Sequence, residues 1–403
     1  MINFDFETYT KKFINIKKYN ELLKKRYYYF NKLKDQTMTG FLKPISNALL
    51  EEIIITANYV KDNFDCMVVI GIGGSFLGSF AFDKMFKRYF NNDCFEVIYI
   101  ENFSSKYIED LLENLNDKNV CLNVISKSGN TMEIKILYNL LKDFLKEKYS
   151  EKELVKRIII TTDKEKGLLR EEANKVGYKS FEIPKDIGGR YSFLTAAHLF
   201  PLALNYDIKE IVEGYFEGEK LFDDAYKYAV IRKLLFESGK YIENYCIYED
   251  NMYYFTEWLK QLFGESEGKD GNGIFPASTV YTRDLHSLGQ FIQDGNKIIF
   301  ETVIKVNNNY TKNIYYNDMT ISKIIDVIYN SVLKAHYNGD VPNIKIEIEN
   351  LNLRTMSQLI YFFMVSAAFS ALLFEVDPFN QPGVEAYKKK LLIDLGVEYE
   401  WFS

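Results

Sequence analysis

The stretch "CMVVIGIGGSFLGSFAFDKMFKRYF", residues 66–90, decides the fold class. Its first five residues form an uninterrupted apolar run, which is typical of a strand buried on both faces. A glycine-rich turn follows, and apolar residues then return at helical spacing in "FAFDKMFKRYF". A strand, a tight turn and a helix in this order predict one βα unit of a parallel sheet.

The same pattern recurs along the chain. The segments "FEVIYI" (95–100), "VCLNVI" (120–125) and "RIIIT" (157–161) each precede a helix-like stretch, and strands resume at "YCIY", "KIIFETVIKV" and "IKIEIE". With 403 residues the chain exceeds one ordinary core. We therefore expect two α/β domains, residues 1–205 with N-terminal helices and residues 206–403 with a C-terminal helix.

Charge and composition limit the classes of partner. Lys and Arg number 50 against 56 Asp and Glu, so no global basic field exists to bind nucleic acid. Residues 355–374 carry no charge and are long enough to span a bilayer. Their polar residues and the lack of a flanking basic cluster favour a buried core helix. The start "MINFDFETYTKKF" lacks a signal-peptide pattern, so we expect a cytoplasmic protein without nucleic-acid or membrane partners.

The glycine turn does not match a dinucleotide site. The GxGxxG fingerprint would need glycine at position 76, where the sequence has Phe76. The turn instead predicts close approach of Gly74 and the Ser75 hydroxyl to a small ligand; a turn without any ligand is the alternative. The four cysteines and three histidines show no zinc spacing, so we expect neither a metal nor a cofactor.

The turn "VISKSGNT", residues 124–131, lies between a predicted strand and a predicted helix. Hydroxyls, an ammonium group and backbone N–H groups at a helix start suit a phosphate. They are supplied by Ser126, Lys127, Ser128 and Thr131. The alternative is a helix cap, which needs only one of these hydroxyls.

The stretch "QLFGESEGKDG", residues 261–271, contains two candidate general bases. Gln261 and Glu265 share a helix face if the helix continues through Gly264. A carboxylate at a helix end beside apolar surface can remove a proton from a substrate. Glu267 meets the same description, and the spacing does not choose between the two acids.

Three further segments carry residues that are ambiguous alone. His286 in "YTRDLHSLGQ" has the character of a structural histidine, and Arg190 in "DIGGRYS" equally suits a salt bridge. In "DPFNQPGVEAYKKK" a helix is predicted to begin near Pro382. Gln381 and Lys388 then fall on one face, where Lys388 reads as solvated.

Taken together, six motifs resemble the glucose-6-phosphate isomerase family, in that family's order, from about residue 70 to 390. They are "GIGGSFLGS", "ISKSGNT", "GGRYSFLTA", "QLFGESEGKDG", "YTRDLHSLGQ" and "FNQPGVEAYK". The resemblance implies two sugar isomerase (SIS) domains, each a parallel sheet flanked by helices. It also implies a homodimer with the active site at the subunit interface, acting on a sugar phosphate.

The resemblance assigns roles that spacing left open. Glu265 matches the base that moves a proton between C1 and C2, and Arg190 matches the residue that stabilises the enediolate. His286, often contributed by the neighbouring subunit, opens the sugar ring with the help of Lys388. The substrate-binding residues would be Gly74, Ser75, Ser126, Lys127, Ser128, Thr131, Gln261 and Gln381. Asn130 departs from the family pattern, which commonly has a second threonine there.

Two other functions compete with this interpretation. A sugar-phosphate sensor would need the phosphate turn but no base, and would usually carry an output domain. An NAD-dependent dehydrogenase is disfavoured by Phe76 in the glycine turn.

Overall fold

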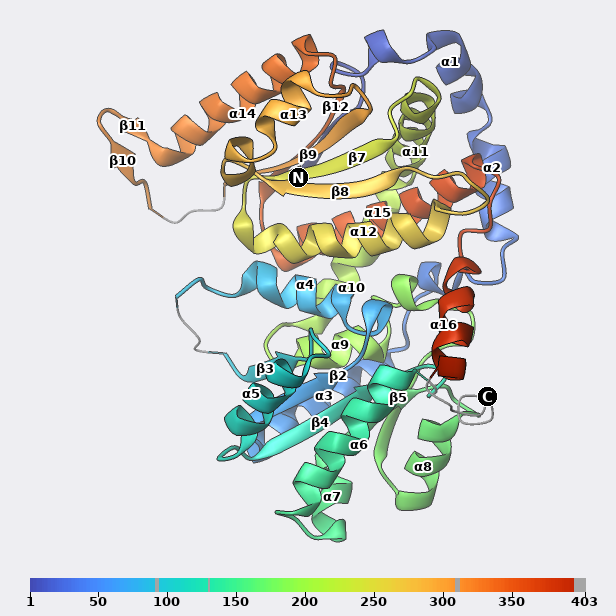
Figure 1. Cartoon of the computed structure of the whole chain (residues 1–403), viewed down its shortest axis with the longest axis vertical. Helices are drawn as coiled ribbons and strands as arrows, with labels where there is room; N and C mark the ends of the chain where they lie inside the picture. The colour runs from blue at the N-terminus through green and yellow to red at the C-terminus, as the bar shows by residue number, and fades with distance from the viewer. Residues whose placement is uncertain (91–93, 130, 309–311, 395–403) are drawn as a thin grey trace. The chain divides into compact units, whose positions relative to one another are not determined.

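The computed structural model describes residues 1–90, 94–129, 131–308 and 312–394, which form two compact units (Figure 1). Unit 1 contains Met1–Asp35 and Glu213–Gln381, and unit 2 contains Gln36–Val212 and the segment from Pro382 onward. Each unit is built on one five-stranded sheet, which confirms the α/β class. The expected division was at residue 205. In the structure the N-terminal segment Met1–Asp35 instead belongs with the second half of the chain, and the segment from Pro382 onward belongs with the first half.

Unit 2 has a wholly parallel sheet with the strand order β3-β2-β4-β5-β6. The central strands are buried along their whole length, as their continuous apolar sequences require. The strands are β2 (Cys66–Ile70), β3 (Glu96–Tyr99), β4 (Val120–Ile125), β5 (Ile158–Thr162) and β6 (Lys179–Glu182).

Helices cover both faces of this sheet. One apolar cluster joins β2, β4 and β5 to α5 (Ser105–Leu115), α6 (Met132–Lys146), α7 (Glu151–Arg157) and α8 (Leu168–Val176). The remaining elements include α3, α4 and α9, with α9 in contact with both α3 and α4. Their bounds, with the short helices, are η2 (Gly40–Leu42), α3 (Asn47–Asn63), η3 (Gly73–Ser75), α4 (Leu77–Phe86), η4 (Gly189–Tyr191), α9 (Ala196–Ala203) and α16 (Gly383–Asp394).

The strand order of unit 2 creates a switch point. From β2 the chain moves outward to β3, and then crosses back to β4 on the other side of β2. Loops that follow β2 and β4 therefore leave toward opposite faces of the sheet. Sheets of this type bind ligands in the crevice at the carboxyl ends of such strands.

Unit 1 has the strand order β1-β12-β9-β7-β8. All neighbours are parallel except β1, which pairs antiparallel with β12 from Ile2 opposite Ile348 to Asp5 opposite Lys345. The strands are β1 (Ile2–Asp5), β7 (Ile242–Ile247), β8 (Phe275–Val280), β9 (Ile299–Asn308) and β12 (Asn343–Asn350), with a separate hairpin of β10 (Tyr315–Tyr316) and β11 (Met319–Thr320). The expected N-terminal helices did not include strand β1.

The helices of unit 1 lie on both sides of its sheet (Figure 1). Those on one side are α11 (Phe222–Glu237), α12 (Tyr253–Glu267) and α15 (Leu353–Leu373), and those on the other are α13 (Gly289–Asp294) and α14 (Ile321–Asn338). The remaining helices are η1 (Lys11–Phe13), α1 (Ile16–Lys24), α2 (Arg26–Lys34), η5 (Gly218–Leu221), η6 (Asp250–Met252) and η7 (Arg283–His286). Helix α10 (Ile208–Glu217) includes the residues where the two units divide.

Helix α15 is the segment that resembled a membrane span. By length and composition it could cross a bilayer, yet every residue from Thr355 to Leu373 except Gln358 is buried. It packs against α11 and α12. It is therefore a core helix of unit 1, as its polar residues predicted.

Candidate functional site

The turn at 126–131 connects β4 to α6 at the switch point of unit 2. The buried Ser126 hydroxyl accepts a hydrogen bond from the N–H of Gly129 at 3.0 Å. Gly129 has a φ of 72°, so the turn needs glycine there. Ser126 thus shapes the turn from within, and Asn130 lies outside the described residues.

The outer part of the turn lies at the surface at Ser128. Ser128 is exposed, and Thr131 precedes the first residue of α6. The Thr131 hydroxyl makes no capping hydrogen bond to the helix. The Thr131 side chain therefore does not cap α6, although it is in the cap position.

Lys127 joins the turn to a second loop. Its ammonium group donates to the carbonyl oxygens of Lys185 and Ile187, each at 2.9 Å. Burial lowers the pKa of Lys127, and the nearby Asp163 and Asp186 oppose that shift. Lys127 therefore ties the turn to the loop that leads to Arg190, using two of its three N–H donors.

The glycine turn after β2 packs directly on the Arg190 segment. A Cβ atom at Gly74 would lie 2.3 Å from the carbonyl carbon of Gly189 and 2.5 Å from the nitrogen of Arg190. Only glycine permits this approach, which is a physical reason for the residue type. The turn and η4 are thereby held in contact, with Ser75 partly buried and Arg190 buried beside them.

A buried histidine fixes this contact. His198 Nδ1 accepts the backbone N–H of Ser79 at 3.0 Å, so the ring proton is on Nε2, which lies 2.9 Å from the Gly74 carbonyl. The Ser192 hydroxyl donates to the carbonyl of Gly189 at 2.6 Å. Burial lowers the pKa of His198 to about 4, and the ring is neutral near pH 7.

In unit 1 the helix α12 continues through Gly264. Gln261 and Glu265 therefore lie on the same face of the helix, as expected from the sequence. Gln261 Nε2 donates to Glu265 Oε1 at 3.2 Å, and both side chains are partly buried. The other amide atom, Gln261 Oε1, is buried without a hydrogen-bond partner among the residues that the structure describes. The pair thus combines a carboxylate with an unused polar atom.

Glu267, the other candidate base, is fully buried and engaged on both oxygens. Arg232 contacts Oε2 and Oε1 through its two terminal nitrogens, each at 2.8 Å. The Ser370 hydroxyl and the N–H of Ile274 add one donor to each oxygen. A carboxylate held in this way is not available to a substrate, and the arrangement favours Glu265.

The remaining candidates lie at the surface of their units. His286 in η7 is exposed, as is Gln381. Lys388 in α16 is 48% exposed and lies 3.1 Å from Glu385. Among the described residues, no hydrogen bond joins His286, Gln381 or Lys388 to another candidate of its own unit.

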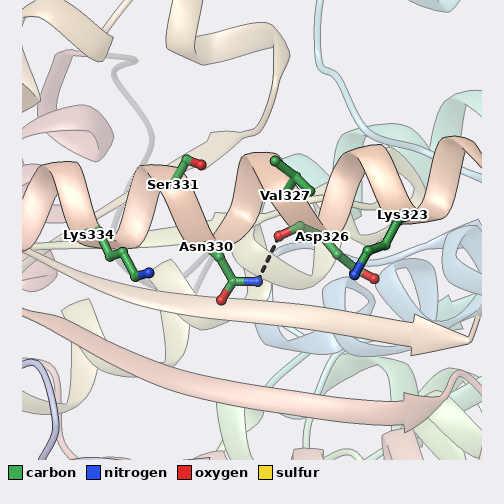
Figure 2. Close-up of a pocket in the computed structure, with 6 residues that line it drawn as sticks. All are labelled: Lys323, Asp326, Val327, Asn330, Ser331 and Lys334. Atoms are coloured by element: carbon green, nitrogen blue, oxygen red, sulfur yellow. Dashed lines mark hydrogen bonds between the residues drawn. The ribbon is translucent and has the colours of Figure 1, made fainter. Parts of the chain in front are cut away.

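A surface hollow of about 200 Å³ lies on α14 (Figure 2). Within it, Asn330 Nδ2 donates to the carbonyl oxygen of Asp326 at 2.8 Å. All of the lining residues belong to that helix: Lys323, Asp326, Val327, Asn330, Ser331 and Lys334. No candidate residue lines it. The described parts of the chain also contain no group of three or more His, Cys, Asp or Glu side chains placed to hold a metal.

Sequence reasoning missed Arg232 and His198. Arg232 stands in the apolar run "YAVIRKLLF" of α11, and a charge at a position that the helical period buries indicates a buried partner. His198 stands in "TAAHLFPLA", where the same reasoning applies. In both cases the signal was present, but it does not identify the partner.

The sequence of the chain is similar to those of known proteins. A profile described as phosphoglucose isomerase matches residues 49–325. A glucose-6-phosphate isomerase of Staphylococcus saprophyticus is 44% identical over 85% of this chain and 83% of its own length, and one from Staphylococcus aureus is 43% identical with the same coverage.

Two solved structures share the fold. A hypothetical protein from Thermus thermophilus has a TM-score of 0.84 at 22% identity, covering 98% of this chain and 100% of its own. A glucose-6-phosphate isomerase from Chlamydia trachomatis has a TM-score of 0.74 at 19% identity, covering 87% of this chain and 73% of its own.

Proposed function

The chain belongs to the phosphoglucose isomerase family, and from this premise we propose that it interconverts glucose 6-phosphate and fructose 6-phosphate. The reaction moves a proton between C1 and C2 through an enediolate. It needs a base, a group that stabilises the oxyanion, and a hold on the phosphate. No cofactor enters this scheme.

Glu265 is the base in this proposal. The observation that carries the choice is the contrast on α12: Glu267 is enclosed by Arg232, Ser370 and Ile274, whereas Glu265 is partly buried beside Gln261. A partly buried carboxylate can contact a substrate C–H bond while its surroundings limit the access of bulk water. Arg190 faces the negative charge that develops on the enediolate oxygen.

The phosphate is held at the start of α6. Backbone N–H groups at a helix N-terminus bind a dianion together with the side chains of Ser126, Lys127, Ser128 and Thr131. The Ser126 hydroxyl also shapes the turn through its hydrogen bond from Gly129. Gly74, Ser75, Gln261 and Gln381 complete the sugar-phosphate contacts. This remote binding energy orients C1 and C2 against the base.

His286 and Lys388 open the sugar ring, because the closed ring carries no acidic C–H next to a carbonyl. An exposed His286, with Leu288 and Phe291 each 47% exposed after it, suits a residue that a second copy of the chain covers. We therefore propose a homodimer in which each subunit supplies His286 to its neighbour, in the cytoplasm.

The test is an assay of purified protein with fructose 6-phosphate and EDTA, with glucose 6-phosphate detected by a coupled reaction. Glu265→Gln should lower kcat about 10²- to 10⁴-fold, since one general base is removed, with little change in KM. The matched control is Glu257→Gln on the same helix, whose carboxylate pairs with Lys260 at 2.5 Å. It should retain kcat.

Two outcomes would contradict the proposal. Normal turnover by Glu265→Gln would remove the base from this position. Wild-type protein that binds fructose 6-phosphate in calorimetry but forms no product would instead point to a sugar-phosphate sensor.

A further inference from the structure

A fully buried ion cluster lies beneath the end of α12. Arg232, Glu243 and Glu267 are each 0% exposed. Arg232 donates through Nε to Glu243 at 2.7 Å and through its two terminal nitrogens to both oxygens of Glu267 at 2.8 Å. One guanidinium group thus joins α11 to β7 and to the last residue of α12.

The Glu267 end of this cluster draws together four parts of unit 1. Its Oε2 accepts from Arg232 of α11 and from Ser370 of α15 at 2.5 Å, and its Oε1 accepts from Arg232 and from the N–H of Ile274 at 3.3 Å. Ile274 directly precedes β8. The helix, the following loop, α11 and α15 are therefore fixed to one carboxylate.

This attachment governs a helix end that would otherwise be weak. The last turn of α12 contains Gly264, and the next residue after the helix is Gly268. Glycines make such an end prone to fraying, because they gain the most conformational freedom when the turn opens. Glu265 lies only two residues before the end, so its position depends on whether this turn is held.

The attachment also sets the rotation of the turn. Residues two apart on a helix are rotated by about 200°. With Glu267 fixed inside the core, Glu265 must face away from it, on the side of Gln261, with which it forms a hydrogen bond. A shift of Arg232 would therefore move the base without touching it.

We propose that Arg232 is a positioning residue for Glu265, which acts by clamping Glu267 and so fixing the last turn of α12. The inference rests on the proposed function of Glu265 as the base. Replacing a buried ion cluster by apolar residues is often neutral or stabilising, so stability alone is a weak reason for it. The planar fork of arginine supplies a defined geometry that an apolar contact does not.

The second carboxylate provides a matched control. Glu243 is equally buried and bound to the same arginine, but it lies on β7 and is also held by hydroxyls of Tyr228, Tyr245 and Thr302. Glu267→Gln and Glu243→Gln make the same chemical change at the two ends of one cluster. Only the first loosens the helix that carries the base.

The experiment compares kcat, KM and thermal midpoint for these two variants, at a temperature where circular dichroism shows both folded. Glu267→Gln should lower kcat by about 10²-fold with KM within about twofold, as expected for a misplaced catalytic group. Glu243→Gln should lower the midpoint and keep kcat within about threefold of wild type. Arg232→Lys, which keeps the charge and loses the fork, should behave as Glu267→Gln does.

A gentler pair covers the case in which Glu267→Gln does not fold. Ser370→Ala removes one donor from Glu267, and Thr302→Val removes one from Glu243. The first should lower kcat by roughly 3- to 10-fold and the second should not.

If both variants of a folded pair had the same kcat, the positioning role of Arg232 would be wrong. An active wild type in the same experiment would still support the proposed function. Wild-type protein without isomerase activity would overturn both.

Discussion

His198 combines complete burial with a ring that has one accepting and one donating nitrogen. Its Nδ1 accepts from the backbone of Ser79 and its Nε2 donates to Gly74. Protonation would place a second N–H opposite the Ser79 donor. The contact between the glycine turn and the Arg190 segment therefore depends on a neutral imidazole.

This arrangement predicts acid destabilisation centred on one residue. The pKa of His198 is lowered by burial to about 4, below the value of about 6.5 in an unfolded chain. The unfolded state therefore binds the proton first, and stability falls as the pH drops from about 6.5 to about 4. At pH 5 the loss is about 2 kcal/mol.

Urea unfolding at pH 7.5 and pH 5.0 measures this loss. His198→Asn keeps one donor and one acceptor but does not titrate in this range. The stability difference between wild type and this variant should shrink by about 2 kcal/mol at the lower pH. An unchanged difference would mean that His198 does not titrate as its burial requires.

At the scale of elements, unit 2 is organised by loops that meet at the carboxyl ends of its strands. Lys127 links the turn after β4 to the carbonyls of Lys185 and Ile187, and Gly74 brings the turn after β2 against Gly189. Two turns and the Arg190 segment are therefore mutually supported. Disturbing one link should affect phosphate binding as well as the chemistry at Arg190.

Lys127→Met removes the donors of this link and keeps most of the stem. We expect KM for fructose 6-phosphate to rise about 10-fold, with a smaller fall in kcat as the Arg190 segment loosens. Lys142→Met is the control, because Lys142 lies on α6, the helix that follows the turn, and pairs with Glu172 of α8. It should leave KM unchanged, and an unchanged KM in Lys127→Met would place the phosphate elsewhere.

The sequence predicted the elements whose burial is visible in their own residues. β2 and β4 have the predicted bounds, because continuous apolar runs between turn residues have one stable solution in a covered sheet. β8, with the sequence "FPASTV", was not predicted, since it contains proline and three small residues and gains its order from pairing with β7. β1 likewise exists through its partner β12.

In the candidate site, too, the sequence indicated some residues, while other contacts are seen only in the structure. Motif resemblance indicated Glu265 as the base. The geometry supports this choice over Glu267, because Arg232, more than thirty residues away in sequence, holds the Glu267 carboxylate. The ammonium of Lys127 was expected to bind a phosphate, and the structure adds two contacts that spacing did not predict, to the carbonyl oxygens of Lys185 and Ile187. Long-range partners of buried charges leave no local pattern, so spacing cannot assign them.

At the scale of the whole molecule, the exposure of His286 leads to a prediction about assembly. Glu265→Gln and His286→Asn should each be nearly inactive alone. If His286 serves the neighbouring subunit, random mixed dimers contain one site with both native residues in every heterodimer. Co-expressed variants should then recover about a quarter of wild-type activity.

The control is a mixture of separately purified variants that has not been allowed to exchange subunits, which should stay inactive. Static light scattering should give twice the mass of one chain. Recovery of no activity in a preparation shown to contain heterodimers would mean that both residues act within one chain.

The pairing of β1 with β12 determines when the N-terminal strand can form during synthesis on the ribosome. Residues 2–5 leave the exit tunnel well before the strand edge that receives them, which spans residues 345–348. At about 5 to 20 residues per second, residues 2–5 wait roughly 20 to 70 seconds for their partner strand. The sheet of residues 66–182 can close within that interval. A segment made before residues 345–348 thus pairs only after they emerge, and a chaperone that shields it would act in this window.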